Sequence, residues 1–156
     1  MTMKLTHAFT LAALVSLGPY DIQLHGTPRT PNAQGSARLV FGESPFGVAV
    51  TTDGHASYDV QLTVSGLPEP STLGAYKAYV AWGVTTDLKQ WRRLGAVANG
   101  RSTVGRVEYN KFMLVIAAES DSLVEKHAGP VVMSGTSPSS FLQMFLSHPM
   151  FRGVAP

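Results

Sequence analysis

The chain has 156 residues, of which 44% are hydrophobic and only 14% are charged, with a formal net charge of +2. This length suits one domain with short extensions, and the mild positive charge is spread along the chain, which argues against a role in binding nucleic acid. Because the chain has no cysteine, disulfides, thiolate catalysis, iron–sulfur clusters and cysteine-ligated zinc are excluded.

Residues 1–35 are expected to form an arm that precedes the main domain. Residues 1–17 resemble a secretory signal peptide, since Lys4 and His7 precede an apolar run that extends to Leu17. A helix over residues 5–17 would be about 20 Å long, shorter than the ~30 Å hydrocarbon core of a bilayer. We therefore expect it to lie in a membrane interface or on a partner protein. The rest of the arm, residues 18–35, is rich in proline and glycine and predicts an extended segment without regular structure.

Alternating apolar residues predict an antiparallel β domain over residues 36–135. A short strand is expected at 37–41, followed by a long hairpin over residues 46–67 whose turn is Asp53-Gly54. The second strand of this hairpin has apolar side chains at every other position, which is typical of a half-buried strand. Further strands are predicted at 75–84, 91–97, 103–109, 112–118 and 130–134, with turns at Asn99-Gly100 and Asn110-Lys111.

Short strands at regular spacing, with no long helical pattern between them, are typical of an immunoglobulin-like antiparallel β-sandwich. We therefore predict an all-β fold of this class. The alternation further predicts that eight side chains are mostly buried, namely Val48, Tyr58, Val60, Leu62, Val80, Trp82, Val115 and Ile116.

Residues 136–156 are expected to form a short apolar helix and a tail. Thr136 to Ser140 has hydroxyl side chains and a proline, which favour a helix start. The following residues from Phe141 to Leu146 are apolar except for Gln143, and His148-Pro149 would end the helix. A helix with so much apolar surface is not expected to have one face in water.

Four segments resemble the strands of a known family. They are Tyr76 to Trp82, Leu94-Gly95, Val115 to Ser120 and Ala128 to Gly135. In this order they resemble the extracytoplasmic β-sandwich domain of anti-sigma-K-type regulators, over about 60 residues. The resemblance implies a sandwich fold and an extracytoplasmic location. It does not imply sigma-factor control, because those regulators carry a cytoplasmic helical domain and a membrane span ahead of the sandwich.

Three groups of residues are candidates for a binding site. His148 with Met144 and Met150 offers imidazole and thioether ligands of the kind that suit copper, but no second histidine is near in the sequence. Glu119, Asp121 and Glu125 could bind calcium, although a solvated loop is the simpler interpretation. Aromatic residues could line a ligand groove or pack in the core, namely Trp82, Trp91, Tyr76 and Tyr79.

No motif of an enzyme is present, since the chain lacks a nucleophile elbow, a phosphate loop, a zinc-protease helix and a glycine-rich dinucleotide turn. We expect no enzymatic activity, no cofactor and no tightly bound metal. A hydrolase whose active site forms only in three dimensions is the least favoured of three hypotheses. The leading hypothesis is a periplasmic or otherwise extracytoplasmic, membrane-associated accessory subunit. Its overall character is similar to that of membrane-extrinsic subunits of bacterial photosynthetic reaction-centre and light-harvesting complexes, although no pigment-ligand motif is present. The runner-up is a periplasmic protein that binds copper or another small ligand.

The docking hypothesis depends on the two apolar segments at the ends of the chain. Together they hold more contiguous apolar side chains than a soluble monomer normally exposes. The expected partners are subunits of a membrane protein complex and the membrane interface, with no nucleic acid involved. The residues expected to make the contact are Leu11, Leu14, Leu17, Phe141, Leu142, Phe145, Met150 and Phe151.

Overall fold

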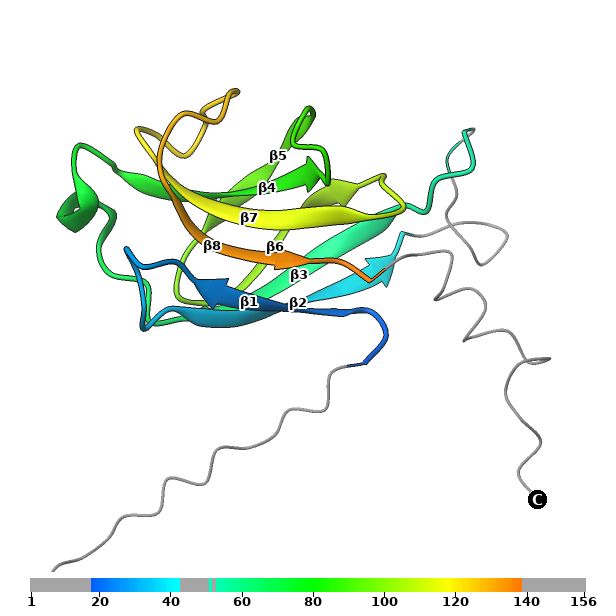
Figure 1. Cartoon of the computed structure of the whole chain (residues 1–156), viewed down its shortest axis with the longest axis horizontal. Coiled ribbons are helices and arrows are strands. Elements are labelled where there is room, and N and C mark those ends of the chain that lie inside the picture. Colours follow the sequence, from blue (N-terminus) through cyan, green and yellow to red (C-terminus); the bar gives the residue numbers. More distant parts are fainter. Residues whose placement is uncertain (1–17, 43–50, 52, 139–156) are drawn as a thin grey trace, which may run out of the picture.

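Eight β-strands and one short 3₁₀-helix form the regular structure of the described residues, which in this computed structural model are 18–42, 51 and 53–138 (Figure 1). The elements in chain order are β1 (Asp21–Gly26), β2 (Gln34–Phe41), β3 (Tyr58–Ser65), η1 (Pro70–Leu73), β4 (Ala78–Thr85), β5 (Trp91–Val97), β6 (Gly100–Val107), β7 (Phe112–Glu119) and β8 (Val131–Thr136).

All eight strands belong to one antiparallel sheet with the order β5-β4-β7-β8-β1-β2-β3-β6. The two outermost strands, β5 and β6, lie against each other, so the sheet is curled and nearly closed (Figure 1). Their backbones are close at Gly105, where an added Cβ would lie 2.9 Å from the carbonyl oxygen of Leu94. The prediction of an all-β antiparallel fold is therefore confirmed. A sandwich of immunoglobulin type is not confirmed, because the sheet is barrel-like.

β-Bulges give a physical reason for the curl of the sheet. The pairing register shifts between Asp59 and Val60 in β3, between Ala81 and Trp82 in β4, and between Ile116 and Ala117 in β7. A bulge adds a residue to one strand, bends it and increases its right-handed twist, and repeated bulges let a sheet curve toward closure.

The inside of the curled sheet is filled by its own side chains. Ile22, Leu24, Val60, Leu62 and Ile116 are each at most 1% exposed. These residues belong to one apolar cluster to which all eight strands contribute. The interior is thus a packed core, as in small barrels whose side chains meet along the axis.

A second apolar cluster lies on the opposite face of β4 and β7, and we call it the outer cluster. It consists of Val80, Trp82, Val84, Val115 and Ala117, against which pack the partly buried Trp91, Met113, Val124 and Val131. The loop between β7 and β8, residues 120–130, contributes to the outer cluster through Val124. Both faces of β4 are therefore buried, and Trp82 is 0% exposed. Seven of the eight burial predictions are confirmed, and the remaining residue, Val48, lies outside the described residues.

Two predictions about strand pairing are wrong. Residues 103–109 and 112–118 were expected to form a hairpin, but β6 pairs with β3, whereas β7 pairs with β4 and β8. The expected hairpin over residues 46–67 is also wrong for β3, which has β2 on one side and β6 on the other, and residues 46–50 lie outside the described residues. The turn at Asp53-Gly54 is nevertheless present, with a φ of 77° at Gly54.

The segment 18–35 was expected to lack regular structure, and this prediction is also wrong. It contains β1, which is a central strand of the sheet between β2 and β8. Ile22 and Leu24 point into the core, so two apolar residues at period 2 are enough to form the strand once both neighbours pair with it. At the other end, Thr136 closes β8 instead of starting a helix, and the rest of the expected apolar helix lies outside the described residues. Within the described ranges, no helix has the length and apolar character needed to cross a membrane.

The ion pair between Asp21 and Arg38 predicts that the free energy of unfolding falls at low pH. The carboxylate of Asp21 accepts hydrogen bonds from Arg38 at 2.9 and 3.1 Å and from the backbone N–H of Gly18 at 2.8 Å. The hydrogen bond from Arg38 lowers the pKa of Asp21 below its usual value, although burial opposes the shift. A lowered pKa in the folded state means that the stabilisation is complete above the unfolded-state pKa. It is lost as the pH falls from about 3.8 through the lower folded-state pKa.

We therefore expect Asp21→Asn to remove part of the acid sensitivity of unfolding. Urea unfolding at pH 6 and at pH 3 would measure it, and the wild type should lose more stability between the two than the variant. Arg38→Gln should have a smaller effect in the same direction, because it removes the two hydrogen bonds from Arg38 and keeps the one from Gly18. An equal loss in the wild type and both variants would contradict this assignment.

Candidate functional site

The described residues that flank both chain ends lie at the same end of the sheet. The backbone N–H of Leu39 in β2 donates to the carbonyl of Tyr20, so the start of β1 lies beside the end of β2. β8 runs antiparallel to β1, with His25 opposite Ser134, which brings Pro138 to this end as well. We call it the terminal end, and it is on the right in Figure 1. The opposite end of the sheet is the far end.

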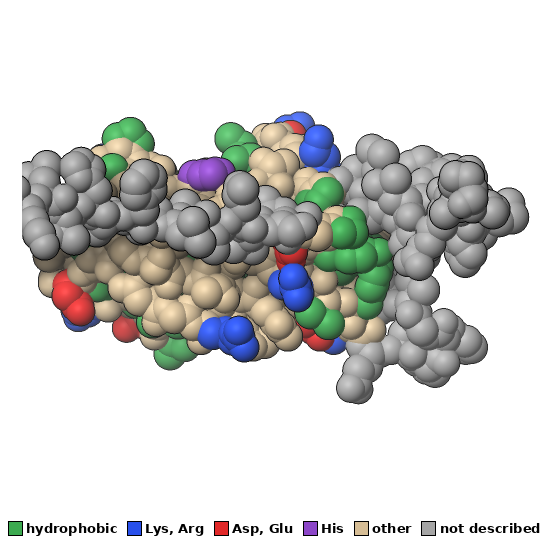
Figure 2. All heavy atoms as spheres, turned by 90° about the horizontal axis from the view of Figure 1, so that it is seen from below, with side chains coloured by type: hydrophobic (Ala, Val, Ile, Leu, Met, Phe, Trp, Pro, Cys, Tyr) green, Lys and Arg blue, Asp and Glu red, His purple; other side chains and the backbone are tan. Residues whose placement is uncertain are grey.

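Aromatic side chains gather at the terminal end. The rings of Tyr20 and Phe41 are 5.3 Å apart in an edge-to-face arrangement, and those of Phe41 and Tyr58 are 4.9 Å apart. Tyr20 and Phe41 are only partly buried, and Val40 beside them is 38% exposed. Figure 2 shows hydrophobic side chains on this part of the surface. The terminal end therefore combines apolar surface with the attachment points of both apolar segments.

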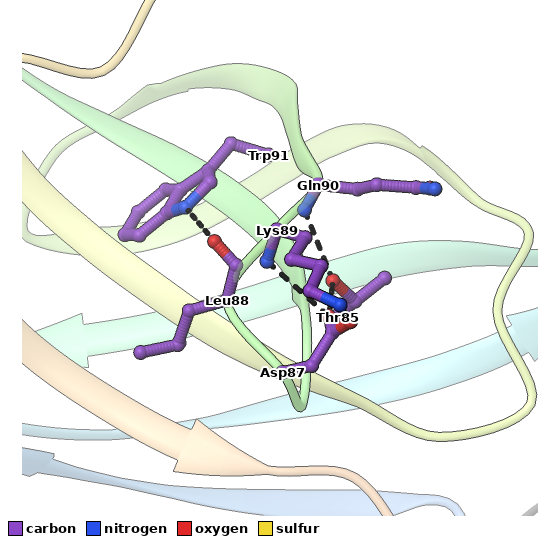
Figure 3. Close-up of polar contacts among 6 residues, drawn as sticks. All are labelled: Thr85, Asp87, Leu88, Lys89, Gln90 and Trp91. Atoms are coloured by element: carbon purple, nitrogen blue, oxygen red, sulfur yellow. Dashed lines mark hydrogen bonds and ion pairs between the residues drawn. The ribbon is translucent and has the colours of Figure 1, made fainter.

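The turn between β4 and β5 lies on the side of the sheet where β7 begins, because Thr85 pairs with Phe112, and Figure 1 shows it at the top of the molecule, apart from the ends of β1 and β8. Its conformation is set by short-range hydrogen bonds (Figure 3). The Thr85 hydroxyl donates to the Asp87 carboxylate at 2.6 Å and accepts from the N–H of Gln90 at 3.1 Å. The Asp87 carboxylate also accepts a hydrogen bond from the N–H of Lys89. The hydrogen bond from the Thr85 hydroxyl is the main reason that the pKa of Asp87 is lowered.

A buried carboxylate and a histidine meet beside the outer cluster. Glu119, at the end of β7, is 1% exposed, and its Oε1 lies 2.9 Å from Nδ1 of His127. The same carboxylate accepts hydrogen bonds from the backbone N–H groups of Ala128 and Gly129. The ring of His127 stacks on Trp91, with centroids 4.1 Å apart and planes 5° apart. Sequence reasoning did not find this group, because no motif links residues eight positions apart on a loop.

A carboxylate that holds Nδ1 of a histidine is also a feature of catalytic dyads and triads, so its chemistry needs to be considered. Such a dyad acts on a hydroxyl or thiol that is hydrogen-bonded to the other ring nitrogen. Among the described residues, no side-chain hydroxyl is hydrogen-bonded to His127. The contacts that are present connect the 120–130 loop to the sheet, together with the bond from Arg93 to the carbonyl of Ser122. The arrangement thus fixes a loop over the outer cluster.

The candidate calcium ligands Glu119 and Asp121 do not converge. Glu119 points to His127 and the backbone, whereas Asp121 accepts a hydrogen bond from the N–H of Leu123 within its own loop. In the part of the chain that the structure describes, no three acidic or histidine side chains are placed to hold a metal ion together.

The four aromatic residues proposed for a groove are separated by the sheet. Trp82 and Trp91 belong to the outer cluster, while Tyr79 and Tyr76 pack on the inner core. Tyr79 lines a far-end pocket of about 280 Å³, bounded by Leu67, Pro68, Glu69, Pro70, Lys77, Ala78, Tyr79, Ala96, Val97, Ala98 and Asn99.

Two polar side chains of this pocket, those of Tyr79 and Asn99, are hydrogen-bonded within the protein. The Tyr79 hydroxyl donates to the carbonyl of Pro68, and the Asn99 side chain bonds both backbone groups of Leu67. Burial is the main reason that the pKa of Tyr79 is raised, with a smaller contribution from Glu69. The pocket lies at the lower limit of ligand-pocket sizes, so it gives little support to the small-ligand alternative.

The docking residues and the copper ligands expected from the sequence lie outside the described residues. These are Leu11, Leu14, Leu17, Phe141, Leu142, Phe145, Met150 and Phe151 for docking, and Met144, His148 and Met150 for copper. The structure does locate the neighbouring described residues, Gly18 and Pro138, at one end of the sheet.

Comparisons with protein-family models, with curated proteins and with solved structures give no match for this chain.

Proposed function

We propose that this protein is a non-enzymatic accessory subunit that docks, in an extracytoplasmic compartment, on a membrane protein complex. The observation that carries the proposal is the position of Gly18 and Pro138 at the terminal end. The apolar segments 5–17 and 141–151 are attached there, so they can reach the same partner surface. A bacterial photosynthetic reaction-centre and light-harvesting complex is the partner that we propose to test first, on the similarity of overall character.

The packing of the sheet supports a role that depends on its surface. Leu24, Val60, Leu62 and Leu114 are 0% exposed, so the interior of the curled sheet is occupied by its own side chains. Binding to the described residues therefore occurs on the outside or at the ends of the sheet. At the terminal end, Tyr20 and Phe41 are only partly buried, and the chain continues from Gly18 and Pro138 into the two apolar segments.

The proposal predicts that the C-terminal segment is needed to stay on the complex. Replacing Phe141, Phe145 and Phe151 together by serine should release the protein from the membrane fraction while the sheet remains folded. Burying one phenylalanine side chain stabilises by about 1.5–3 kcal/mol, so the loss of three weakens association strongly. Fractionation of native membranes followed by circular dichroism of the released protein would measure both effects.

High salt should release the wild type poorly, because apolar contacts are not screened by ions. Leu123→Ser provides a control, since Leu123 is 76% exposed in the loop between β7 and β8. The protein with this substitution should stay on the membrane. A wild-type chain that remains monomeric and soluble at high concentration without detergent would refute the proposal.

A further inference from the structure

The connection between β5 and β6 contains Asn99, which is followed by Gly100 at the start of β6. Both residues are exposed, and Gly100 has a φ of 105°. Because glycine has no side chain, its backbone nitrogen is unshielded and can attack Cγ of the preceding asparagine, which is the first step of deamidation. The other two asparagines of the chain, Asn32 and Asn110, are followed by residues whose side chains hinder this attack.

The side chain of Asn99 connects the β5–β6 turn to the loop between β3 and β4. Its Oδ1 accepts a hydrogen bond from the N–H of Leu67 at 3.0 Å, and its Nδ2 donates to the carbonyl of Leu67 at 2.8 Å. Leu67 lies in that loop and is only 6% exposed. The same loop is held a second time, because the Tyr79 hydroxyl donates to the carbonyl of Pro68 at 2.9 Å. The amide of Asn99 therefore helps to close the far end of the sheet.

These two hydrogen bonds oppose deamidation in the folded protein. For the new bond to form, Cγ of Asn99 has to turn toward the nitrogen of Gly100, and this rotation moves Oδ1 and Nδ2 away from Leu67. Both backbone groups of Leu67 would then lose their partners, which is unfavourable because the residue is buried. Deamidation at this position is therefore expected after the contact has opened, and not from the closed far end.

From these observations we propose that Asn99 is a modification site, at which deamidation follows the opening of its contact with Leu67 and then prevents the contact from re-forming. The nitrogen of Gly100 gives its proton to hydroxide and bonds to Cγ of Asn99. The bond from Cγ to Nδ2 breaks, and the nitrogen takes a proton from water and leaves as ammonia. A second water then opens the succinimide ring and yields aspartate or isoaspartate.

Either product weakens the closure of the far end. An aspartate side chain has no N–H to donate, and it places a negative charge beside the carbonyl of Leu67. Isoaspartate also lengthens the backbone of the turn by one methylene group. The modified chain therefore keeps its far end open, and this inference is independent of the proposed function.

The first test compares deamidation rates in the folded full chain and in the same chain unfolded by guanidinium chloride, using mass spectrometry of its peptides. In the unfolded chain, Asn99 should react about tenfold or more faster than Asn32 and Asn110, because glycine follows it. Folding should slow the reaction at Asn99 by about tenfold or more, since two hydrogen bonds must first break. Equal rates at Asn99 in the two states would overturn the protection by Leu67. An unfolded-state rate at Asn99 no higher than that at Asn110 would overturn the site itself.

The second test measures the consequence with Asn99→Asp. Hydrogen exchange at the amide of Leu67 should be about tenfold or more faster than in the wild type, because the variant cannot donate to the Leu67 carbonyl. The matched control is Asn32→Asp, which adds the same charge at an exposed residue whose backbone adjoins Gly66 in the same loop. It should leave exchange at Leu67 unchanged. Wild-type exchange in Asn99→Asp would overturn the inference. An equal acceleration in Asn32→Asp would also overturn it, because charge alone would then open the loop.

Discussion

Replacing Trp82 by alanine should lower the free energy of unfolding by about 3–5 kcal/mol, the range measured for large aromatic residues in cores. Trp82 is 0% exposed and is the largest side chain of the outer cluster. It makes edge-to-face contacts with Trp91, at 6.4 Å between ring centroids, and with His127, at 5.8 Å. Removing it leaves a cavity between the sheet and the 120–130 loop, and the loop cannot collapse freely because Glu119 holds its end. Urea unfolding monitored by circular dichroism would give the value.

Two further variants separate packing from hydrogen bonding. The indole N–H of Trp82 is buried without a hydrogen-bond partner. Trp82→Phe should therefore cost much less than Trp82→Ala, since it keeps most of the packing and loses no hydrogen bond. Leu123→Ala, at an exposed position of the covering loop, should change stability by less than about 0.5 kcal/mol. A similar cost for phenylalanine and alanine at position 82 would show that the polar group of the indole matters.

Replacing Gly135 by alanine should destabilise the sheet by about 3 kcal/mol, because the added methyl group meets backbone. The new Cβ would lie 2.2 Å from the carbonyl oxygen of Gln23 and 2.8 Å from Cγ2 of Ile22, so β1 and β8 would have to separate. Unfolding in urea would measure the loss. Hydrogen exchange should show it first at the backbone amides of β1 and β8.

Gly54→Ala is the matched control for this substitution. Its new Cβ would have no neighbour within 4 Å, but Gly54 has a φ of 77°, so alanine introduces only local backbone strain. Such strain costs about 1–2 kcal/mol. An alanine at position 135 that costs no more than one at position 54 would mean that β8 shifts easily to make room, against the packing described here.

Period-2 alternation predicted the strands of this chain better than it predicted their partners. Seven predicted core residues, from Tyr58 to Ile116, are buried, because a strand with one apolar face must place that face against other apolar groups. The Asn110-Lys111 turn was taken as a hairpin because turn residues are local signals. The strands on either side of it pair elsewhere, through contacts between residues that are distant in the sequence. Curvature was largely hidden, since the extra residues at the three register shifts are Gly105, Leu94 and Val132, and only the glycine is a residue type that marks a bulge.

The candidate site was likewise predicted only in part, since its local features can be recognised from the sequence and its long-range contacts cannot. Apolar segments can be recognised from the sequence alone, and residues 5–17 and 141–151 are two of them. That both are attached at one end follows only from the antiparallel pairing of β1 with β2 and β8. The left-handed backbone of Leu88, with a φ of 61°, could not have been predicted, because leucine rarely adopts this conformation. It is accompanied by a hydrogen bond from the Leu88 N–H to the carbonyl of Thr85 and one from Nε1 of Trp91 to the Leu88 carbonyl.

The central position of β8 has a consequence for synthesis of the chain. β8 is the last strand to be made, yet it joins the group β5-β4-β7 to the group β1-β2-β3-β6. Until residue 136 has left the ribosome, β7 and β1 each have an unpaired edge, and such edges invite association with other chains. A product that stops before β8 would therefore carry two open edges into its compartment, which favours capture by chaperones or proteases over assembly on a partner.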